Sequence, residues 1–402
     1  MSPAATNVRS RAGHRGLGDA GIAGALALAT DYADQVVVGT VRDVHGAVAS
    51  RAFGLTNLAT AGCARGHQRL HDSISEAVYG GLTSGARTVS AGLRAVDRRG
   101  IGPRLDASHA GRGLLSAVNG LLGDRLAEER PELAIELAVR QRGADVPPDR
   151  DGLAAAFPGA TPDLVVFLHG LGENDESWDL RREERGGSYG SRLAEETGWT
   201  PVFLRANTGL PIAENGVALA SLLDRLVAHW PTEVRRIALV GHSMGGLVIR
   251  AACAVLTEEE TRWHALVSDV VTLGTPHLGA PLERTVHLGA RVLGVLPESA
   301  PFGRILEYRS VGILDLRMGL SADVQHLPHA RYHLVAATLA ESHRHPVSAL
   351  FGDLLVRYPS ALGRSRRGGE MFPGADVLHV RGGHFELLNH PQVYDALRTW
   401  LA

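Results

Sequence analysis

The sequence contains no lysine, few cysteines and no long hydrophobic run. All 41 basic residues are arginine, and with 43 acidic residues they leave a formal charge of −2, so we expect no nucleic-acid partner. The two cysteines, Cys63 and Cys253, are too few for a disulfide framework, which allows a reducing compartment. No stretch of about 18 or more residues is free of charged and turn residues, so a membrane-spanning helix is not expected.

The length and the composition indicate a globular protein with more than one part. Its 402 residues are 45% hydrophobic and 21% charged, which excludes a wholly disordered chain. At about 150 residues per domain, we expect two domains or one large domain with an attachment. A short apolar run at 21–29 follows three arginines, loosely like a secretion signal, but Asp19 and the many glycines and alanines favour the first helix of a small domain. We therefore expect a cytoplasmic protein, peripheral to a membrane or lipid surface if it docks on one.

Residues 1–150 show helical periodicity. Apolar residues recur every three or four positions in four stretches: 41–48, 70–82, 89–96 and 114–126. Residues 1–120 carry 13 arginines against 8 acidic residues. Two interpretations stay open: a helical bundle that packs on itself or on the next domain, or an amphipathic surface that docks on a membrane or lipid granule. Two prolines and three acids at 143–152 are typical of a linker, so we divide the chain into a helical N-terminal region at 1–150 and a second domain at 151–402.

After residue 160 the pattern changes to strands that alternate with helices. Six short apolar runs are expected as strands: 164–168, 201–204, 236–240, 270–273, 333–336 and 377–380. Amphipathic stretches between them and at the C-terminus are expected as helices. This alternation predicts the α/β class, with a mostly parallel central sheet covered on both faces.

The sequence Gly241-His242-Ser243-Met244-Gly245 matches the pattern G-x-S-x-G. It lies between a predicted strand and a predicted helix, which is the context that a nucleophile elbow requires. A sharp turn there would lift the Ser243 hydroxyl above the sheet edge. The helix N-terminus behind it would offer N–H groups to a developing oxyanion. We therefore predict that Ser243 is a nucleophile.

A second glycine-rich turn, His169-Gly170-Leu171-Gly172, follows the first predicted strand directly. A hydrolase elbow takes one oxyanion donor from the residue after the nucleophile and another from a loop of this kind. We predict that the backbone N–H groups of Leu171 and Met244 are these two donors.

The general base must be one of 19 histidines, and the chain order of nucleophile, acid and base narrows the choice. His384 follows the last predicted strand and precedes an amphipathic C-terminal helix, so we predict it as the base. Three other histidines are expected to have other roles. His379 is expected to be structural, His390 to cap a helix, and His242 to point away from the site.

The predicted acid is Asp353, which follows the strand near 333–336 and precedes His384. Its carboxylate would orient the imidazole and stabilise its charged form. Asp376 is the rival, although its position just before the final strand favours a turn cap. Asp323 falls in a segment interpreted as a lid.

From about residue 160 to its end, the chain resembles an α/β-hydrolase of the lipase and esterase kind. Three phrases carry the resemblance: H-G-L-G at 169–172, V-G-H-S-M-G-G-L at 240–247 and L-G-T-P-H-L-G at 273–279. The third is similar to a segment of bacterial triacylglycerol lipases and of relatives of the GPI inositol-deacylase. The resemblance implies a Ser-Asp-His triad on Ser243, Asp353 and His384, with Leu171 and Met244 as oxyanion donors. The helical N-terminal region has no counterpart in this pattern.

An insertion at about 278–330 carries apolar stripes. It would form either a helical lid over the site or ordinary packing on the sheet. His277, in the third phrase, would either touch the site or hold a turn, and we favour the turn. No H-E-x-x-H motif, zinc-spaced cysteine pair or P-loop occurs, so neither a metal nor another cofactor is expected.

Together these features predict an α/β-hydrolase fold with a helical lid, preceded by an all-helical N-terminal region. The predicted reaction is hydrolysis of a small-molecule or lipid carboxylic ester through an acyl-enzyme. Three alternatives remain: an acyltransferase with the same triad, a depolymerase that docks on intracellular polyester granules through residues 1–150, and a non-catalytic lipid-surface scaffold. The intact set of Ser243, Asp353 and His384 argues against the scaffold.

Overall fold

The computed structural model describes most of the chain from residue 65 onward. The described residues are 65–98, 105–255, 262–279, 310–320, 326–340, 355–364 and 369–402, with the single positions 23, 24, 27, 30, 49, 50, 53, 324, 342 and 353. The helices are α3 (Arg65–Arg98), α4 (His109–Glu129), α5 (Arg150–Ala156), α6 (Tyr189–Thr197), α7 (Ile212–His229), α8 (Met244–Cys253), α9 (Arg262–Leu266), α12 (Val311–Met318), α14 (Tyr358–Ala361) and α15 (Pro391–Trp400). Short 3₁₀ turns are η3 (Leu105–Ala107), η4 (Pro131–Leu133), η5 (Asp175–Asp179) and η6 (His384–Leu387).

An eight-stranded sheet with the order β2-β1-β4-β3-β5-β6-β7-β8 forms the centre of the molecule. Its strands are β1 (Ala138–Gln141), β2 (Ala144–Val146), β3 (Asp163–Leu168), β4 (Thr200–Arg205), β5 (Arg236–His242), β6 (Val267–Leu273), β7 (Arg331–Thr338) and β8 (Asp376–Arg381). The six strands from β3 to β8 are mutually parallel, and they are the six that the sequence predicts. The predicted mostly parallel sheet is therefore confirmed.

Helices cover both faces of this sheet, because successive side chains of β3 point to opposite faces and each face is apolar. Leu164, Val166 and Leu168 enter a core with side chains of α7 and α8. Val165 and Phe167 enter a second core with side chains of α6 and α15. All six residues of β3 are buried, as a central parallel strand requires. This layered arrangement, with a strand-turn-helix at Ser243, is the predicted α/β-hydrolase fold.

The predicted linker at 143–152 is wrong. This segment instead holds β2 and the first turn of α5, whose N-cap is Asp149. β1 and β2 form an antiparallel hairpin, and β1 joins the sheet antiparallel to β4. The strands have only four and three residues and carry charged side chains, so they lack the apolar run that marks a buried strand. The sheet therefore includes residues from both sides of the predicted division at residue 150.

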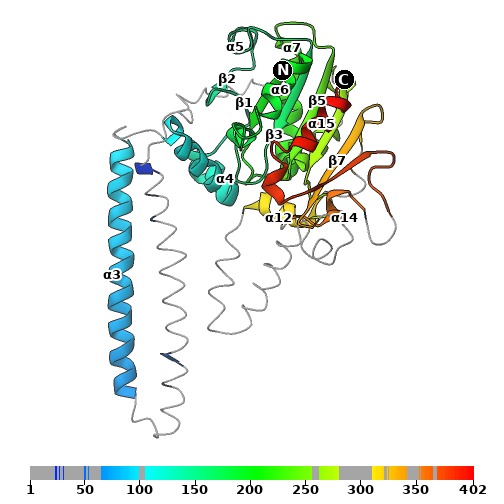
Figure 1. Cartoon of the computed structure of the whole chain (residues 1–402). Coiled ribbons are helices and arrows are strands. Elements are labelled where there is room, and N and C mark those ends of the chain that lie inside the picture. The colour runs from blue at the N-terminus through cyan, green and yellow to red at the C-terminus, as the bar shows by residue number, and fades with distance from the viewer. Residues whose placement is uncertain are drawn as a thin grey trace, which may run out of the picture.

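Helices dominate the described residues that precede the sheet, as predicted. Two predicted stripes, 70–82 and 89–96, lie in one continuous helix, α3, and the stripe at 114–126 lies in α4. The stripe at 41–48 lies outside the described residues. In Figure 1, α3 extends away from the sheet domain, whereas α4 lies beside it.

Much of the predicted lid lies outside the described residues, including 280–309, 321–323 and with them Asp323. Its described helix, α12, packs on the start of α7: Ile212 N–H donates to Asp315 Oδ2 at 2.9 Å, and Gly312 N–H donates to the Gly209 carbonyl at 3.0 Å. Among the helices of the described ranges, none combines the length and the apolar character needed to cross a bilayer.

Candidate active site

The chain turns sharply at Ser243, between β5 and α8. Ser243 has φ 52° and ψ −121°, a strained conformation for a residue with a side chain. The turn depends on flanking glycines, since a Cβ on Gly241 would lie 2.6 Å from Gly246 Cα and one on Gly245 would lie 2.6 Å from the His169 carbonyl oxygen. Ser243 thus stands at the carboxyl end of β5 with the N-terminus of α8 behind it, as a nucleophile elbow requires.

The glycine-rich turn after β3 lies directly against this serine. A Cβ on Gly170 would lie 2.9 Å from Ser243 Cβ. Met244 is the first residue of α8, where a backbone N–H has no partner within the helix. Among the described residues, no backbone hydrogen bond uses the N–H of Leu171 or of Met244. Both groups can therefore donate to a negatively charged oxygen, and the N-terminus of α8 favours such a charge.

Asp353 and His384 lie in contact although they are far apart in sequence. His384 Nδ1 is 2.7 Å from Asp353 Oδ2, and both residues are buried. The other carboxylate oxygen accepts hydrogen bonds from Leu355 N–H at 3.0 Å and Val356 N–H at 2.7 Å. His384 N–H also donates to the Asp353 carbonyl at 3.0 Å. The carboxylate is therefore held on one side by backbone and faces the imidazole with the other.

The rival acid, Asp376, lies elsewhere. Its carboxylate is 3.0 Å from Nδ1 of His333, and 63% of its side chain is exposed. The contacts of the described residues thus bring Asp353, and not Asp376, against His384.

The other histidines considered above have surroundings apart from the Asp353–His384 pair. His379 Nε2 lies 2.7 Å from Thr338 Oγ1. His390 is the N-cap residue of α15, although its side chain makes no capping hydrogen bond. His277 is fully buried, its Nε2 lies 3.3 Å from Thr272 Oγ1, and burial holds its pKa well below the usual value. His277 is therefore neutral and belongs to the turn after β6, as the favoured interpretation holds.

Sequence reasoning missed a buried ion pair behind the serine. His242 Nδ1 lies 3.0 Å from the Glu173 carboxylate, and His242 Nε2 lies 3.3 Å from the His384 carbonyl oxygen. Burial favours neutral forms of both groups, but the charge of His242 and its hydrogen bond lower the pKa of Glu173 to about 2. Glu173 in turn raises the pKa of His242 despite its burial. The only sequence signal is an acid directly after His169-Gly-Leu-Gly172.

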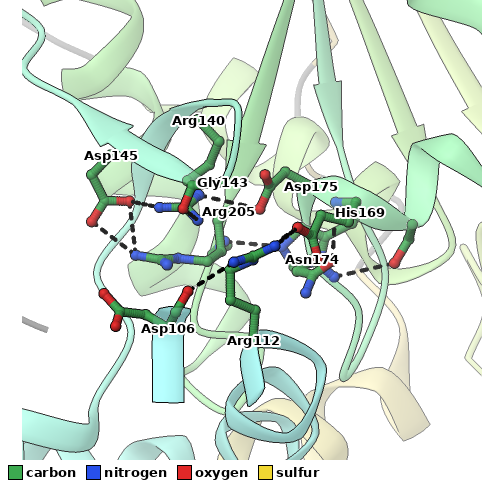
Figure 2. Close-up of polar contacts among 12 residues, drawn as sticks. Asp106, Arg112, Arg140, Gly143, Asp145, His169, Asn174, Asp175 and Arg205 are labelled. Carbon is green, nitrogen blue, oxygen red and sulfur yellow. Dashed lines mark hydrogen bonds and ion pairs between the residues drawn. The ribbon is translucent and has the colours of Figure 1, made fainter. Parts of the chain in front are cut away.

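Two buried arginines brace the segment that follows the glycine-rich turn at 169–172, called the oxyanion turn from here on after its predicted role (Figure 2). Arg140 of β1 and Arg205 of β4 are 3% and 4% exposed. Arg140 Nε lies 3.2 Å from Asp175, the first residue of η5, and both guanidinium groups bind Asp145 on β2. The β1–β2 hairpin is thereby tied to η5, four residues beyond Leu171.

Helix α4 packs against the same turn. A Cβ on Gly120 would lie 2.9 Å from Gly172 Cα, and Gly172 N–H donates to Thr208 Oγ1 at 3.0 Å. Arg112 of α4 donates through Nε to Glu176 of η5 at 2.8 Å. A helix from the N-terminal region therefore forms part of the support of the site.

A cavity of about 600 Å³ lies beside the oxyanion turn. Its walls include His109 of α4, Glu173, Leu180 and Phe385. Phe385 is 50% exposed, and its ring centroid lies 5.7 Å from that of His384. The cavity thus presents apolar surface next to the imidazole.

The central part of the chain matches a known family. Residues 160–308 match the family model described as "Putative serine esterase (DUF676)". This range contains Ser243 and the turn at 169–172, and the match supports ester hydrolysis as the class of reaction. The predicted resemblance to hydrolases of the lipase and esterase kind is confirmed. No curated protein sequence matches the chain.

Solved structures with similar folds include lipases and esterases. The mature lipase BlEst2 of Bacillus licheniformis is 21% identical, with a TM-score of 0.41 over 59% of this chain and 91% of that one. The product of gene lin2722 of Listeria innocua is 17% identical, with a TM-score of 0.39 over 59% and 92%. The Pyrococcus furiosus esterase Pf2001 is 16% identical, with a TM-score of 0.37 over 61% and 84%.

Proposed function

We propose that this protein hydrolyses carboxylic esters, with Ser243 as nucleophile, His384 as general base and Asp353 as the group that orients the base. The observation that carries the proposal is the strained elbow at Ser243, which presents a serine hydroxyl at a helix N-terminus. The 2.7 Å contact between His384 and Asp353 supports it, because a carboxylate on Nδ1 leaves Nε2 as the basic nitrogen.

The proposed reaction has two halves. Ser243 Oγ attacks the ester carbonyl carbon while His384 Nε2 takes the hydroxyl proton. The N–H groups of Leu171 and Met244 donate to the oxyanion of the tetrahedral intermediate. The intermediate then collapses, the C–O bond breaks, and His384 gives its proton to the leaving alcohol. Water attacks the acyl-enzyme with the same base, and the carboxylic acid leaves as Ser243 regains its proton.

Apolar acyl groups fit the surroundings of the site best. The half-exposed side chains of Phe385 and Leu180 line the cavity beside the oxyanion turn. Burial of each methylene group of an acyl chain there contributes about 0.8 kcal/mol. The substrate class we propose is therefore a small-molecule or lipid ester with an apolar acyl chain.

The experiment that tests the proposal is labelling with a fluorophosphonate, followed by intact-mass analysis. We expect one adduct on the wild-type chain and none on Ser243→Ala. No adduct on folded wild-type protein, with and without detergent, would contradict an activated serine. A panel of p-nitrophenyl esters of increasing chain length then tests the acyl preference. Product analysis with an added alcohol tests hydrolysis itself, since a new ester instead of free acid would identify an acyltransferase.

A further inference from the structure

Helix α3 exposes a row of large apolar side chains. Ile74, Val78, Leu82 and Val89 are each more than half exposed, and Val96 is 37% exposed. A surface helix normally turns such residues toward a core. Five exposed apolar side chains in one helix mark a surface that binds another molecule.

The spacing within this row has the period of a coiled-coil seam. The positions Val78, Leu82, Gly85, Val89, Gly92 and Val96, called here the α3 strip, follow one another in steps of four and three. A repeat of 3.5 residues keeps a narrow seam on one side of a helix and is typical of helix pairs. Along the strip, Leu82, Val89 and Val96 fall on one side of the seam, and Gly85 and Gly92 fall on the other side together with Val78.

The two glycines leave open space on the helix surface. A Cβ on Gly85 or on Gly92 would meet no atom within 4 Å. Each glycine therefore forms a shallow hollow beside Val89, and the backbone of another helix can approach closely at these points. Glycine in a helix interior costs about 1 kcal/mol relative to alanine, so a close contact is a reason for its presence here.

Phe53 packs its ring against His71, which lies before the strip, with the ring centroids 5.3 Å apart. Within residues 78–96, the contact of α3 with the described residue Ala27 uses another side of the helix. Ser90, on another side of the helix, is fully buried and donates to the Ala27 carbonyl at 3.1 Å. Between residues 77 and 96 the charged residues are Arg87 and Arg94, and helical geometry places both opposite the strip. The strip and its borders are thus uncharged, so two copies can meet there without repulsion.

We infer that the α3 strip binds the α3 strip of a second copy of this chain, with the two helices antiparallel. An antiparallel pair centred near residue 87 sets Val89 opposite Gly85 and Leu82 opposite Gly92, so that each bulky side chain meets a hollow. Val78 and Val96 then meet at both ends. A parallel pair would set valine against valine and glycine against glycine. The layers of such a pair would be overfilled at the valines and empty at the glycines. The antiparallel pair is a closed, two-fold symmetric contact.

A lipid surface is the competing occupant, and the strip fits it less well. Helices that lie on membranes carry a broad apolar face with aromatic residues and a cationic border. The α3 strip is narrow, has no aromatic residue, and has no charge at its border.

The size of the contact sets the strength of the dimer. From Ile74 to Val96 the row spans about 33 Å at about 1.5 Å per residue, which is small for a protein interface. We therefore expect a reversible dimer whose population depends on concentration.

Sedimentation velocity of the full chain over a range of concentrations tests the inference. We expect a monomer–dimer equilibrium in the wild type. The double variant Gly85→Ala with Gly92→Ala should weaken dimerisation about tenfold or more, because two methyl groups fill the hollows. The matched control is Gly80→Ala, on the opposite side of α3, where a Cβ also meets nothing within 4 Å. Circular dichroism should show that the helix content of both variants is equal to or higher than that of the wild type, since alanine favours helix.

Two outcomes would overturn the inference. One is a wild-type chain that stays monomeric at every concentration. The other is a double variant that dimerises as strongly as the wild type and the control. Flotation with phosphatidylcholine and phosphatidylglycerol vesicles distinguishes a lipid surface from a second copy of the chain. Added methyl groups on the strip weaken the dimer but should preserve or strengthen lipid binding. If the wild type and the double variant both bind vesicles and neither forms a dimer, the strip is assigned to a lipid surface.

Discussion

The carboxylate of Glu173 lies 3.0 Å from Nδ1 of His242, and this buried pair joins three segments that meet at Ser243. Glu173 also accepts a hydrogen bond from Gly170 N–H at 2.9 Å, in the oxyanion turn. The other nitrogen of His242 reaches the carbonyl of His384 at 3.3 Å. The Glu173–His242 pair therefore connects the oxyanion turn, the elbow at Ser243 and the segment that carries His384.

The first prediction concerns Glu173→Gln. The amide keeps an acceptor for Gly170 N–H but removes the charge that raises the pKa of His242. Burial is then opposed less strongly and the pKa of His242 falls, so its contact with the His384 carbonyl weakens. We expect kcat for a short-chain ester to fall about ten- to a hundredfold with a smaller change in KM. Glu183→Gln, in an exposed segment, is the control and should match the wild type.

The same variant has a pH signature in stability. The pKa of Glu173 is lowered to about 2 from 4.5, so its contribution is lost as pH falls from 4.5 toward 2. The pKa of His242 is raised above 6.5, so its contribution is complete below 6.5 and is lost as pH rises through the raised value. The difference in melting temperature between wild type and variant should therefore be largest between pH 4.5 and 6.5 and should shrink at higher pH. A difference that is constant across pH would show that no titrating pair is involved.

The second prediction separates the two candidate acids. Asp353→Asn should reduce kcat/KM by about 10⁴, because the amide no longer holds His384 in the productive tautomer. Asp376→Asn should leave activity within about twofold, since Asp376 contacts His333 and not His384. Ester hydrolysis, measured on both variants and on the wild type, decides which of the two carboxylates acts on His384. Loss of activity in Asp376→Asn alone would reassign the acid.

Much of the geometry of the candidate site could be predicted from local sequence. Ser243 stands between an apolar run and an amphipathic stretch, and a Cβ on its neighbour Gly241 would meet the backbone of Gly246 within the same turn. The central strands β3 and β5 are buried on both faces, so each leaves an apolar run in the sequence.

The parts that could not be predicted depend on contacts between distant residues. The hairpin of β1 and β2 is polar because Arg140 reaches Asp175, 35 positions along the chain. Glu173 and His242 are 69 positions apart, and neither has a periodic pattern that marks it as a partner of the other. Likewise, nothing in the apolar stripe of α4 indicates that its glycine face contacts the oxyanion turn.

The third prediction concerns the arginine that braces η5. Arg140→Met would leave the buried carboxylate of Asp175, whose side chain is 9% exposed, without its partner on β1. Removing one member of a buried pair costs about 3–5 kcal/mol, so the free energy of unfolding should fall by about that amount. Arg150→Met, at the exposed start of α5, should change it by less than about 0.5 kcal/mol. Chemical denaturation measures both, and equal values for the two variants would argue against a structural role for the network.

The last prediction tests whether α4 supports catalysis. Gly120→Ala adds a methyl group that would lie 2.9 Å from Gly172 Cα, so the helix or the oxyanion turn must shift. Removing one oxyanion donor altogether costs about 10²–10³ in kcat, and a displaced turn should cost less, about tenfold. KM should change little, because the ground-state ester does not depend on that donor.

The matched control for this substitution is Gly159→Ala, where an added Cβ meets nothing within 4 Å. It should leave kcat unchanged. Alanine at position 120 also favours the helical state of α4, so a slower enzyme with unchanged or higher helix stability would show that the contact acts on the site and not on folding. Equal kcat in the two variants would mean that the turn tolerates the methyl group, and that α4 is not needed to hold the oxyanion donor of Leu171 in place.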